Sequence, residues 1–235
     1  MDRPASGGAR NTVWLGRVDG ERCIVRRSER TIAALEWELD VIEAVRTIGL
    51  GAPAIIQTLA GERFRDCVVV HEFVDGRPPA SREDWLNVAQ NLIALHTAVR
   101  DMEQRPGFLS ALDLLSAERG GDVDLTVMPA EAVRRCRAAW ARLAGYPATL
   151  VHGDPGECNI LMGDSGVVLL DWDESRVDVP LFDLAALPAE ASPVDEHERW
   201  IASQAASAWE AAVSWRVEPE YARRRLAELA NSSPL

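Results

Sequence analysis

The sequence predicts an α+β protein of two lobes, a small β-rich lobe with one helix followed by a larger, mainly helical lobe. Two stretches, 12–27 and 54–73, resemble hairpins, each with a turn signal between two strand-like runs. The segment VDGRPPA at 74–80 combines turn formers with two prolines, which is typical of a linker. Beyond it helical periodicity dominates, interrupted by short apolar strands between 148 and 173.

The first lobe is expected over residues 1–73. Asp19-Gly20 separates the two strands of its first hairpin, because this dipeptide favours a tight turn. A helix is expected over 31–47, before a stretch rich in Gly and Pro that stops it. The strands and the turn of the second hairpin are expected at Ala54–Thr58, Arg65–Phe73 and Ala60–Glu62.

The second lobe is expected over 81–235, after a hinge over 74–80. Ser81 and Asp84 resemble a capping box, which begins a helix that we expect to run to about Val99. Further helices are expected at 130–143 and 195–231. The strands of this lobe are expected in ATLVHGD, NILMG and GVVLLDWD.

Composition and charge narrow the class of protein. The 235 residues are 47% hydrophobic and 26% charged, as in an ordinary globular chain with a real core. The net charge is −12 and all 25 basic residues are Arg, so we expect no nucleic-acid partner and no reaction that needs Lys. The chain has no bilayer-spanning apolar run and no secretory signal, so we expect a soluble cytoplasmic protein with no membrane partner. The four Cys form no CxxC pair and indicate neither a zinc site nor a disulfide framework.

The segment VHGDPGECNILMGDSGVVLLDWD, from Val151 to Asp173, carries the most informative chemistry. Asp154, Asn159 and Asp171 each stand where a strand gives way to a loop, so we expect them to converge at one edge of a β patch. Asn159 and Asp171 offer the oxygen ligands that Mg²⁺ prefers, which leaves Asp154 to accept a proton from a substrate hydroxyl. These roles match phosphoryl transfer. The simpler interpretation is that all three are turn formers, which are common in loops.

HGDxxxxN at 152–159, followed by an apolar hairpin that ends in Asp, resembles the aminoglycoside phosphotransferase and small-molecule kinase family. LIALHTAV at 92–99 and VPLFDLA at 179–185 resemble further elements of that family. The resemblance covers most of the chain. It implies the two-lobed protein-kinase-like fold.

The same resemblance implies a role for each matching residue. Asp154 is then the catalytic base, and Asn159 and Asp171 bind the metal. Asp183 braces the catalytic loop, and His152 is a structural residue beneath it.

In kinases a cation on a strand pairs with an acid on a helix to hold the nucleotide phosphates. Ile24-Val25-Arg26-Arg27 resembles that strand, with Arg26 at the cation position. Glu36 and Glu38 compete for the partner role. Glu38 is favoured because its helical neighbours are nearly all apolar and a charge there needs a partner, whereas the neighbours of Glu36 are acidic. The simpler interpretation makes Arg26 a surface strand residue.

The phosphate-covering loop and the hinge complete the expected nucleotide site. GGARN at 7–11 offers Gly8 as the candidate phosphate contact, but it lacks GxGxxG, and its early position leaves the usual first strand missing or minimal. By resemblance, backbone groups of Glu72 to Val74 contact the base, so that ATP and GTP both stay open as donors. Asp173 is either a second metal-shell acid or, as we prefer, a residue that orders the loop.

The acceptor is expected between the catalytic loop and the C-terminal helices. Asp195, Glu196, Glu198 and Glu210 are candidates for recognising amines there, although a solvated helix face explains them equally well. We therefore expect a Mg²⁺-dependent kinase for a small-molecule hydroxyl. An aminoglycoside or other cationic antibiotic, as in antibiotic resistance, and a metabolic amino alcohol or sugar are the acceptor classes that stay open. The alternatives are a nucleotide-binding pseudokinase, because of the weak glycine loop, and a protein kinase, which the short 171–183 interval disfavours.

Overall fold

The computed structural model describes residues 4–5, 11–99 and 102–229, whose contacts form two compact units. The first, here called the sheet unit, consists of Met1–Pro79 and Glu157–Asp173. The second, the helical unit, consists of Ala80–Gly156 and Glu174–Leu235. No helix in the described ranges is long and apolar enough to cross a membrane. The α+β class is confirmed, and the division into functional lobes stays a prediction.

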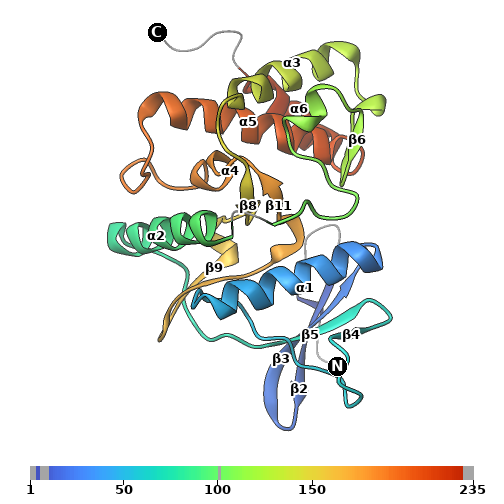
Figure 1. Cartoon of the computed structure of the whole chain (residues 1–235), viewed down its shortest axis with the longest axis vertical. Coiled ribbons are helices and arrows are strands. Elements are labelled where there is room, and N and C mark those ends of the chain that lie inside the picture. Colours follow the sequence, from blue (N-terminus) through green and yellow to red (C-terminus); the bar gives the residue numbers. More distant parts are fainter. Residues whose placement is uncertain (1–3, 6–10, 100–101, 230–235) are drawn as a thin grey trace. The chain divides into compact units, whose positions relative to one another are not determined.

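The sheet unit contains an antiparallel sheet of five strands, in the order β1-β2-β3-β5-β4 (Figure 1). Its strands are β1 (Pro4–Ala5), β2 (Asn11–Val18), β3 (Glu21–Ser28), β4 (Phe64–Arg65) and β5 (Val68–Glu72). Asp19 and Gly20 join β2 to β3 with φ of 51° and 88°, the left-handed pair that a tight hairpin requires. The first predicted hairpin is confirmed. Of the expected first strand, the described residues contain Pro4–Ala5, which pair with β2.

The second predicted hairpin is wrong in its details. β5 pairs with the two-residue β4 through a turn at Asp66-Cys67, where φ is 52° and 59°. Ala54–Thr58 forms no regular strand and meets β5 at a single bridge, Ile55 to His71. Asp66-Cys67 is not a usual turn dipeptide, so the sequence offered no signal for a turn inside the expected strand Arg65–Phe73.

Helix α1 (Ile32–Thr47) lies beside the sheet of the same unit (Figure 1). The side chain of Thr31 caps it by accepting a hydrogen bond from the N–H of Ala34 over 3.3 Å. Gly49, with φ of 85°, follows its end. The apolar face that anchors the helix comprises Leu35, Leu39, Val41, Ile42 and Val45.

The hairpin of β9 (Ile160–Gly163) and β10 (Gly166–Leu169) belongs to the sheet unit. Val168 forms a bridge to Gly51, where a Cβ would lie 2.3 Å from the carbonyl oxygen of Val167. β8 (Thr149–Val151) pairs instead with β11 (Arg176–Asp178), in the helical unit. The expectation of one common β patch is therefore wrong, because two separate strand pairs form.

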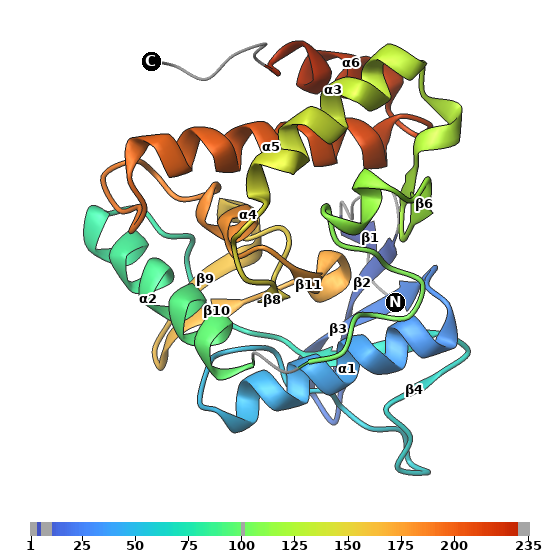
Figure 2. The same cartoon turned by 45° about the horizontal axis from the view of Figure 1, so that its top comes forward.

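The helical unit contains α2 (Arg82–Ala98), α3 (Ala130–Trp140), α4 (Leu181–Leu184), α5 (Glu196–Ser214) and α6 (Pro219–Ala227). It also holds the short pair β6 (Arg119–Gly120) and β7 (Val123–Asp124). Helices α3, α5 and α6 pack together (Figure 2). The predicted tail helix is in fact two helices, since α6 restarts at Pro219 after a break. Short 3₁₀ turns cover Asp113–Leu115, Leu125–Val127, Ala141–Leu143, Glu157–Asn159 and Trp172–Glu174.

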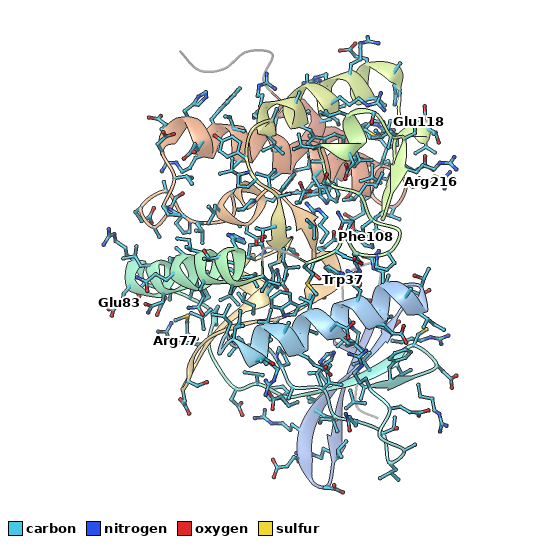
Figure 3. The ribbon with its side chains drawn as sticks, viewed as in Figure 1. Trp37, Arg77, Glu83, Phe108, Glu118 and Arg216 are labelled. Atoms are coloured by element: carbon cyan, nitrogen blue, oxygen red, sulfur yellow. The ribbon has the colours of Figure 1, made fainter. Side chains whose placement is uncertain are left out.

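The predicted capping box of α2 is present. The hydroxyl of Ser81 accepts from the N–H of Asp84, and the Asp84 carboxylate accepts from the N–H of Ser81 over 2.9 Å. Asp84 is buried by this role, whereas its neighbour Glu83 is exposed and points away from the helix (Figure 3). The apolar face of α2, with Leu92 and Leu95 fully buried, faces the core of the unit.

Candidate active site

The carboxylate of Asp183, in α4, holds the loop that carries Asp154. The carboxylate of Asp183 accepts from the backbone N–H of His152 and of Gly153, each over 2.8 Å. It also lies 2.8 Å from Nε2 of His96 on α2. Although burial alone would raise it, the pKa of Asp183 is lowered by the hydrogen bond and charge of His96 and by the backbone N–H of Gly153. The bracing role expected of Asp183 is what the structure shows.

The turn at Gly153 admits only glycine. Its φ is +90°, and a Cβ would lie 2.3 Å from the carbonyl oxygen of Glu174. His152 is fully buried, with Nδ1 facing the backbone N–H of Asp154 at 3.4 Å. Asp154 itself is exposed. The expectation that His152 supports the loop agrees with this placement, and the loop presents Asp154 outward.

The open end of the β9–β10 hairpin brings Asn159 and Asp171 to adjacent positions. The register pairs Ile160 with Leu169, and the N–H of Leu170 donates to the carbonyl of Asn159 over 2.8 Å. Asp171 follows with φ of 55°, and its side chain is half exposed.

These two residues form a donor set that fits Mg²⁺, because they supply an amide oxygen and a carboxylate. Mg²⁺ usually takes one or two protein oxygens and completes its shell with phosphates and water. Among the described residues, no three His, Cys, Asp or Glu side chains gather into a richer metal centre.

Asp173, two residues beyond Asp171, is bound on both oxygens by Arg30. Nε of Arg30 donates to Oδ1 over 3.0 Å and NH2 donates to Oδ2 over 2.7 Å. NH2 also donates to the backbone carbonyl of Asp173 over 3.1 Å. Both side chains are about nine-tenths buried, at 10% and 7% exposure. The geometry favours the loop-ordering role for Asp173, and the sequence offered no signal for Arg30 as its partner.

Arg26 and Glu38 form a buried ion pair in the sheet unit, through NH2 and Oε1. Glu36 is exposed, as is Arg27 on the opposite face of β3. The predicted pairing and strand register are therefore confirmed. Burial alone would lower the pKa of the Arg26 guanidinium, but the charges of Glu38, Asp173 and Asp171 raise it, so Arg26 remains charged. NH1 of Arg26 lies 3.9 Å from Oδ1 of Asp171.

The hinge candidates lie at the end of β5. The N–H of Glu72 already donates to the carbonyl of Ala54 over 2.9 Å, so this N–H is not available to a base. The Glu72 side chain accepts from the N–H of Ala54 over 2.8 Å and from Arg46 over 3.2 Å. Val74 follows and is partly exposed. Gly8, the expected phosphate contact, lies outside the residues that the structure describes.

A pocket of about 470 Å³ opens in the helical unit, and Asp154 lines it. Its other walls come from the loop that carries Asp154 and from α4, α5 and α6. Of the acids expected to recognise amines, Glu210 lines this pocket. Asp195 and Glu198 instead form the capping box of α5. The pocket residues that the sequence did not single out are Phe182, Ser203, Gln204, Ser207, Trp209, Arg225 and Glu228.

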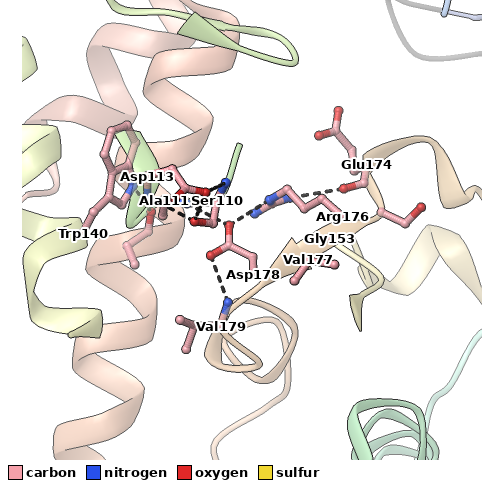
Figure 4. Close-up of polar contacts among 12 residues, drawn as sticks. Ser110, Ala111, Asp113, Trp140, Gly153, Glu174, Arg176, Val177, Asp178 and Val179 are labelled. Carbon is pink, nitrogen blue, oxygen red and sulfur yellow. Dashed lines mark hydrogen bonds and ion pairs between the residues drawn. The ribbon is translucent and has the colours of Figure 1, made fainter. Parts of the chain in front are cut away.

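Arg176 and Asp178 form a buried ion pair that the sequence did not predict (Figure 4). Nε of Arg176 donates to Oδ2 of Asp178 over 2.9 Å, and NH1 donates to the carbonyl of Glu174 over 3.2 Å. The pKa of Asp178 is raised by its burial. The guanidinium of Arg176 stacks 3.6 Å from the centre of the Trp209 ring, which fixes one wall of the pocket.

The five-stranded sheet, the helical unit and the loop His152–Asp154, which Asp183 holds, are together the features of a protein-kinase-like phosphotransferase. The chain belongs to the phosphotransferase enzyme family, which it matches over residues 2–227. The predicted family, fold class and enzyme class are confirmed. No curated protein sequence matches the chain.

Solved structures support the fold. An aminoglycoside phosphotransferase, APH(4)-Ia, is similar with a TM-score of 0.68 and 13% identity, over 98% of this chain and 95% of that one. Choline kinase LicA from Streptococcus pneumoniae is similar with a TM-score of 0.62 and 16% identity, over 96% of this chain and 92% of that one. An amicoumacin kinase is similar with a TM-score of 0.64 and 15% identity, over 94% of this chain and 78% of that one.

The structure brings together part of the predicted site. Asn159 and Asp171 lie at one hairpin end, with Arg26 beside Asp171, all in the sheet unit. Asp154 belongs to the helical unit. The convergence of Asp154 with Asn159 and Asp171 stays a prediction.

Proposed function

We propose that this protein transfers the γ-phosphate of ATP or GTP to a hydroxyl group of a small molecule. The observation that carries the proposal is the position of Asp154. Its loop is pinned by the buried carboxylate of Asp183, and its side chain lines a pocket of about 470 Å³. A positioned carboxylate beside an acceptor-sized pocket is suited to accept the proton of a substrate hydroxyl.

The nucleotide side is assigned to the sheet unit. Arg26, held by Glu38, would offset phosphate charge, and Gly8 would contact the phosphates. Backbone groups from the carbonyl of Glu72 to Val74 would bind the base. These roles give the proposed division into a nucleotide lobe (1–73), a hinge (74–80) and an acceptor lobe (81–235).

Asn159 and Asp171 would hold Mg²⁺. When bound, the ion neutralises charge on the transferring phosphate and fixes its orientation. The orientation of Asp171 would depend on the adjacent Asp173, since Arg30 binds both oxygens of Asp173.

The acceptor classes that we propose follow from the similar structures. The solved amicoumacin kinase was determined with AMP-PNP, Ca²⁺ and Ami, and another neighbour is a choline kinase. An antibiotic and a metabolic amino alcohol or sugar are therefore both acceptors to test. A cytoplasmic location suits such substrates and donors.

The proposal is tested by measuring ADP release from Mg²⁺-ATP and Mg²⁺-GTP across a panel of hydroxyl acceptors. Asp154→Ala should keep nucleotide affinity and melting temperature but lose about 10²- to 10⁴-fold in turnover, the usual cost of a lost general base. Asp164→Ala, in the exposed β9–β10 turn, is the control and should behave as wild type. Turnover of Asp154→Ala close to the wild-type value would remove Asp154 from this role.

The metal assignment has its own test, which does not depend on turnover. Asn159→Ala and Asp171→Ala should weaken the binding of Mg²⁺-ATP in calorimetry, and Asp171→Ala should do so more because it removes a charge. Unchanged affinity in both variants would show that the metal ligands lie elsewhere. Nucleotide binding by wild type without turnover of any acceptor would favour the pseudokinase.

A further inference from the structure

The charged residues that line the acceptor pocket do not all remain available to a ligand. Four of the described lining residues are charged, namely Asp154, Glu210, Arg225 and Glu228. In the proposed reaction Asp154 is reserved for the acceptor hydroxyl. The charge that the pocket offers to the rest of the acceptor therefore depends on how the other three are paired.

Arg225 contacts both carboxylate oxygens of Glu210. Its Nε lies 2.7 Å from Oε2, and NH2 donates to Oε1 over 3.1 Å. The phenol of Tyr221 also donates to Oε2 of Glu210. Burial and Glu210 raise the pKa of Tyr221 to about 12, so the phenol stays a donor at neutral pH. Glu210 is thus satisfied by the protein itself.

The guanidinium of Arg225 also contacts Glu228, the second glutamate that lines the pocket. NH1 of Arg225 donates to Oε2 of Glu228, which also accepts from the hydroxyl of Ser207 over 3.0 Å. One arginine therefore links two carboxylates and cancels one of their two charges. Apart from Asp154, the wall keeps a single net negative charge.

Much of the remaining wall is apolar. Phe182 and Trp209 meet edge to face, with ring centres 5.8 Å apart, and both line the pocket. Small side chains, Ala185, Ala186 and Ala206, complete this side. An acceptor with an apolar portion would bury it against these residues and gain the corresponding hydrophobic free energy.

We propose that the acceptor is an alcohol with an apolar portion and at most one positive charge, and that Arg225 excludes polycationic acceptors. The proposal rests on the proposed function and narrows its acceptor class. A second amine on the ligand would compete with Arg225 for Glu210, whose two carboxylate oxygens Arg225 already contacts. That exchange replaces one ion pair by another and leaves two cations close together, so it brings no net gain.

The test compares wild type with Arg225→Met and Arg225→Lys. The control is Arg223→Met, because Arg223 is exposed on the same helix. The probes are choline and erythromycin, which carry one positive charge, and 2-deoxystreptamine and kanamycin A, which carry several. Dissociation constants come from calorimetry at low and high salt, and kcat/KM from phosphate transfer.

Wild type, Arg225→Lys and Arg223→Met should bind a singly charged probe more tightly than kanamycin A. Arg225→Met should bind kanamycin A at least about tenfold more tightly than wild type at low salt, and salt should remove this gain. Kanamycin A as the best wild-type ligand, or no gain in Arg225→Met, would overturn the inference. Absence of phosphate transfer to every probe and acceptor would instead contradict the proposed function. If Arg225→Met has a changed melting temperature, Arg225→Lys becomes the decisive variant. The inference predicts that Arg225→Lys keeps the wild-type preference for singly charged probes, because it keeps the positive charge. A role of Arg225 that does not depend on charge predicts that Arg225→Lys loses this preference too.

Discussion

Arg30 donates to both carboxylate oxygens of Asp173 across 143 residues of sequence, and this pair anchors the segment that presents Asp171. Both side chains are nearly buried, at 10% and 7% exposure. A buried ion pair contributes little by itself, but removing one partner leaves an unpaired charge. The pair therefore makes the order of the Asp171 segment depend on a residue between β3 and α1.

Replacement of Arg30 should disturb both stability and metal-dependent binding. Arg30→Met should lower the free energy of unfolding by about 3–5 kcal/mol, because Asp173 would be left buried without its partner. The double variant Arg30→Met with Asp173→Leu should recover most of that stability. Calorimetry should show that affinity for Mg²⁺-ATP falls in Arg30→Met and stays low in the double variant. If the double variant recovered both its stability and its affinity for Mg²⁺-ATP, Arg30 would have only a structural role.

The Arg26–Glu38 pair predicts a contrast between adjacent arginines on β3. Arg26→Met should lose most kcat/KM for nucleotide, since phosphate charge is unbalanced and buried Glu38 loses its partner. Arg26→Lys should keep substantial activity, and exposed Arg27→Met should be close to wild type. A double-mutant cycle across Arg26 and Glu38 should give a coupling of about 0.5–3 kcal/mol. Normal kinetics in both Met variants would show that β3 does not hold phosphates.

Asp183 is expected to be the most sensitive residue of the loop support. Asp183→Ala removes the acceptor for the backbone N–H groups of His152 and Gly153 and for His96, so it should cost about 3–5 kcal/mol of unfolding free energy. Turnover should fall even where the variant is folded, because the loop of Asp154 is no longer pinned. Denaturant titration measures the first effect, with Asp164→Ala as the control. A cost below about 1 kcal/mol would contradict the bracing role.

His71 should make stability depend on pH. Burial, with the nearby charge of Arg26, lowers the pKa of His71 to about 3, so it is neutral in the folded protein. The unfolded chain takes up a proton near pH 6.5, and stability is therefore lost as pH falls from about 6.5 towards 3. Between pH 7 and pH 5 the difference in unfolding free energy between wild type and His71→Gln should shrink by about 2 kcal/mol.

The control for His71 is His197→Gln, because His197 is exposed on α5. The difference in unfolding free energy between wild type and His197→Gln should not change between pH 7 and pH 5. An equal response of the two variants would show that the burial of His71 is not what sets the pH dependence.

Features that depend on neighbours in sequence could be predicted. Asp19-Gly20 gave a hairpin turn, because its backbone preference is local. The capping box of Ser81 and Asp84 spans a single helical turn. Glu38 could be chosen over Glu36 because its apolar neighbours lie within the same helix, and an acid on that face needs a cation from a nearby strand.

Other features could not be predicted, because nothing local distinguishes them. The Asp66-Cys67 turn has no typical turn dipeptide, and the predicted single β patch is two strand pairs, since an apolar run does not specify its partner strand. Arg30 and Asp173 are ordinary polar residues in sequence, and only the fold pairs them.

The sequence by itself predicted the Asp19-Gly20 turn, the capping box at Ser81 and the Arg26–Glu38 pair, since each depends on short spacing or helical periodicity. The roles of Asp154, Asn159 and Asp171 stay predictions. The tertiary structure alone decided which charged residues of the pocket beside Asp154 are already paired. Arg225 comes from α6, Glu210 comes from α5, and an ion pair forms only where packing brings two such helices together. Charge counted along a sequence therefore does not give the charge that a ligand meets, because Coulomb attraction depends on distance in space.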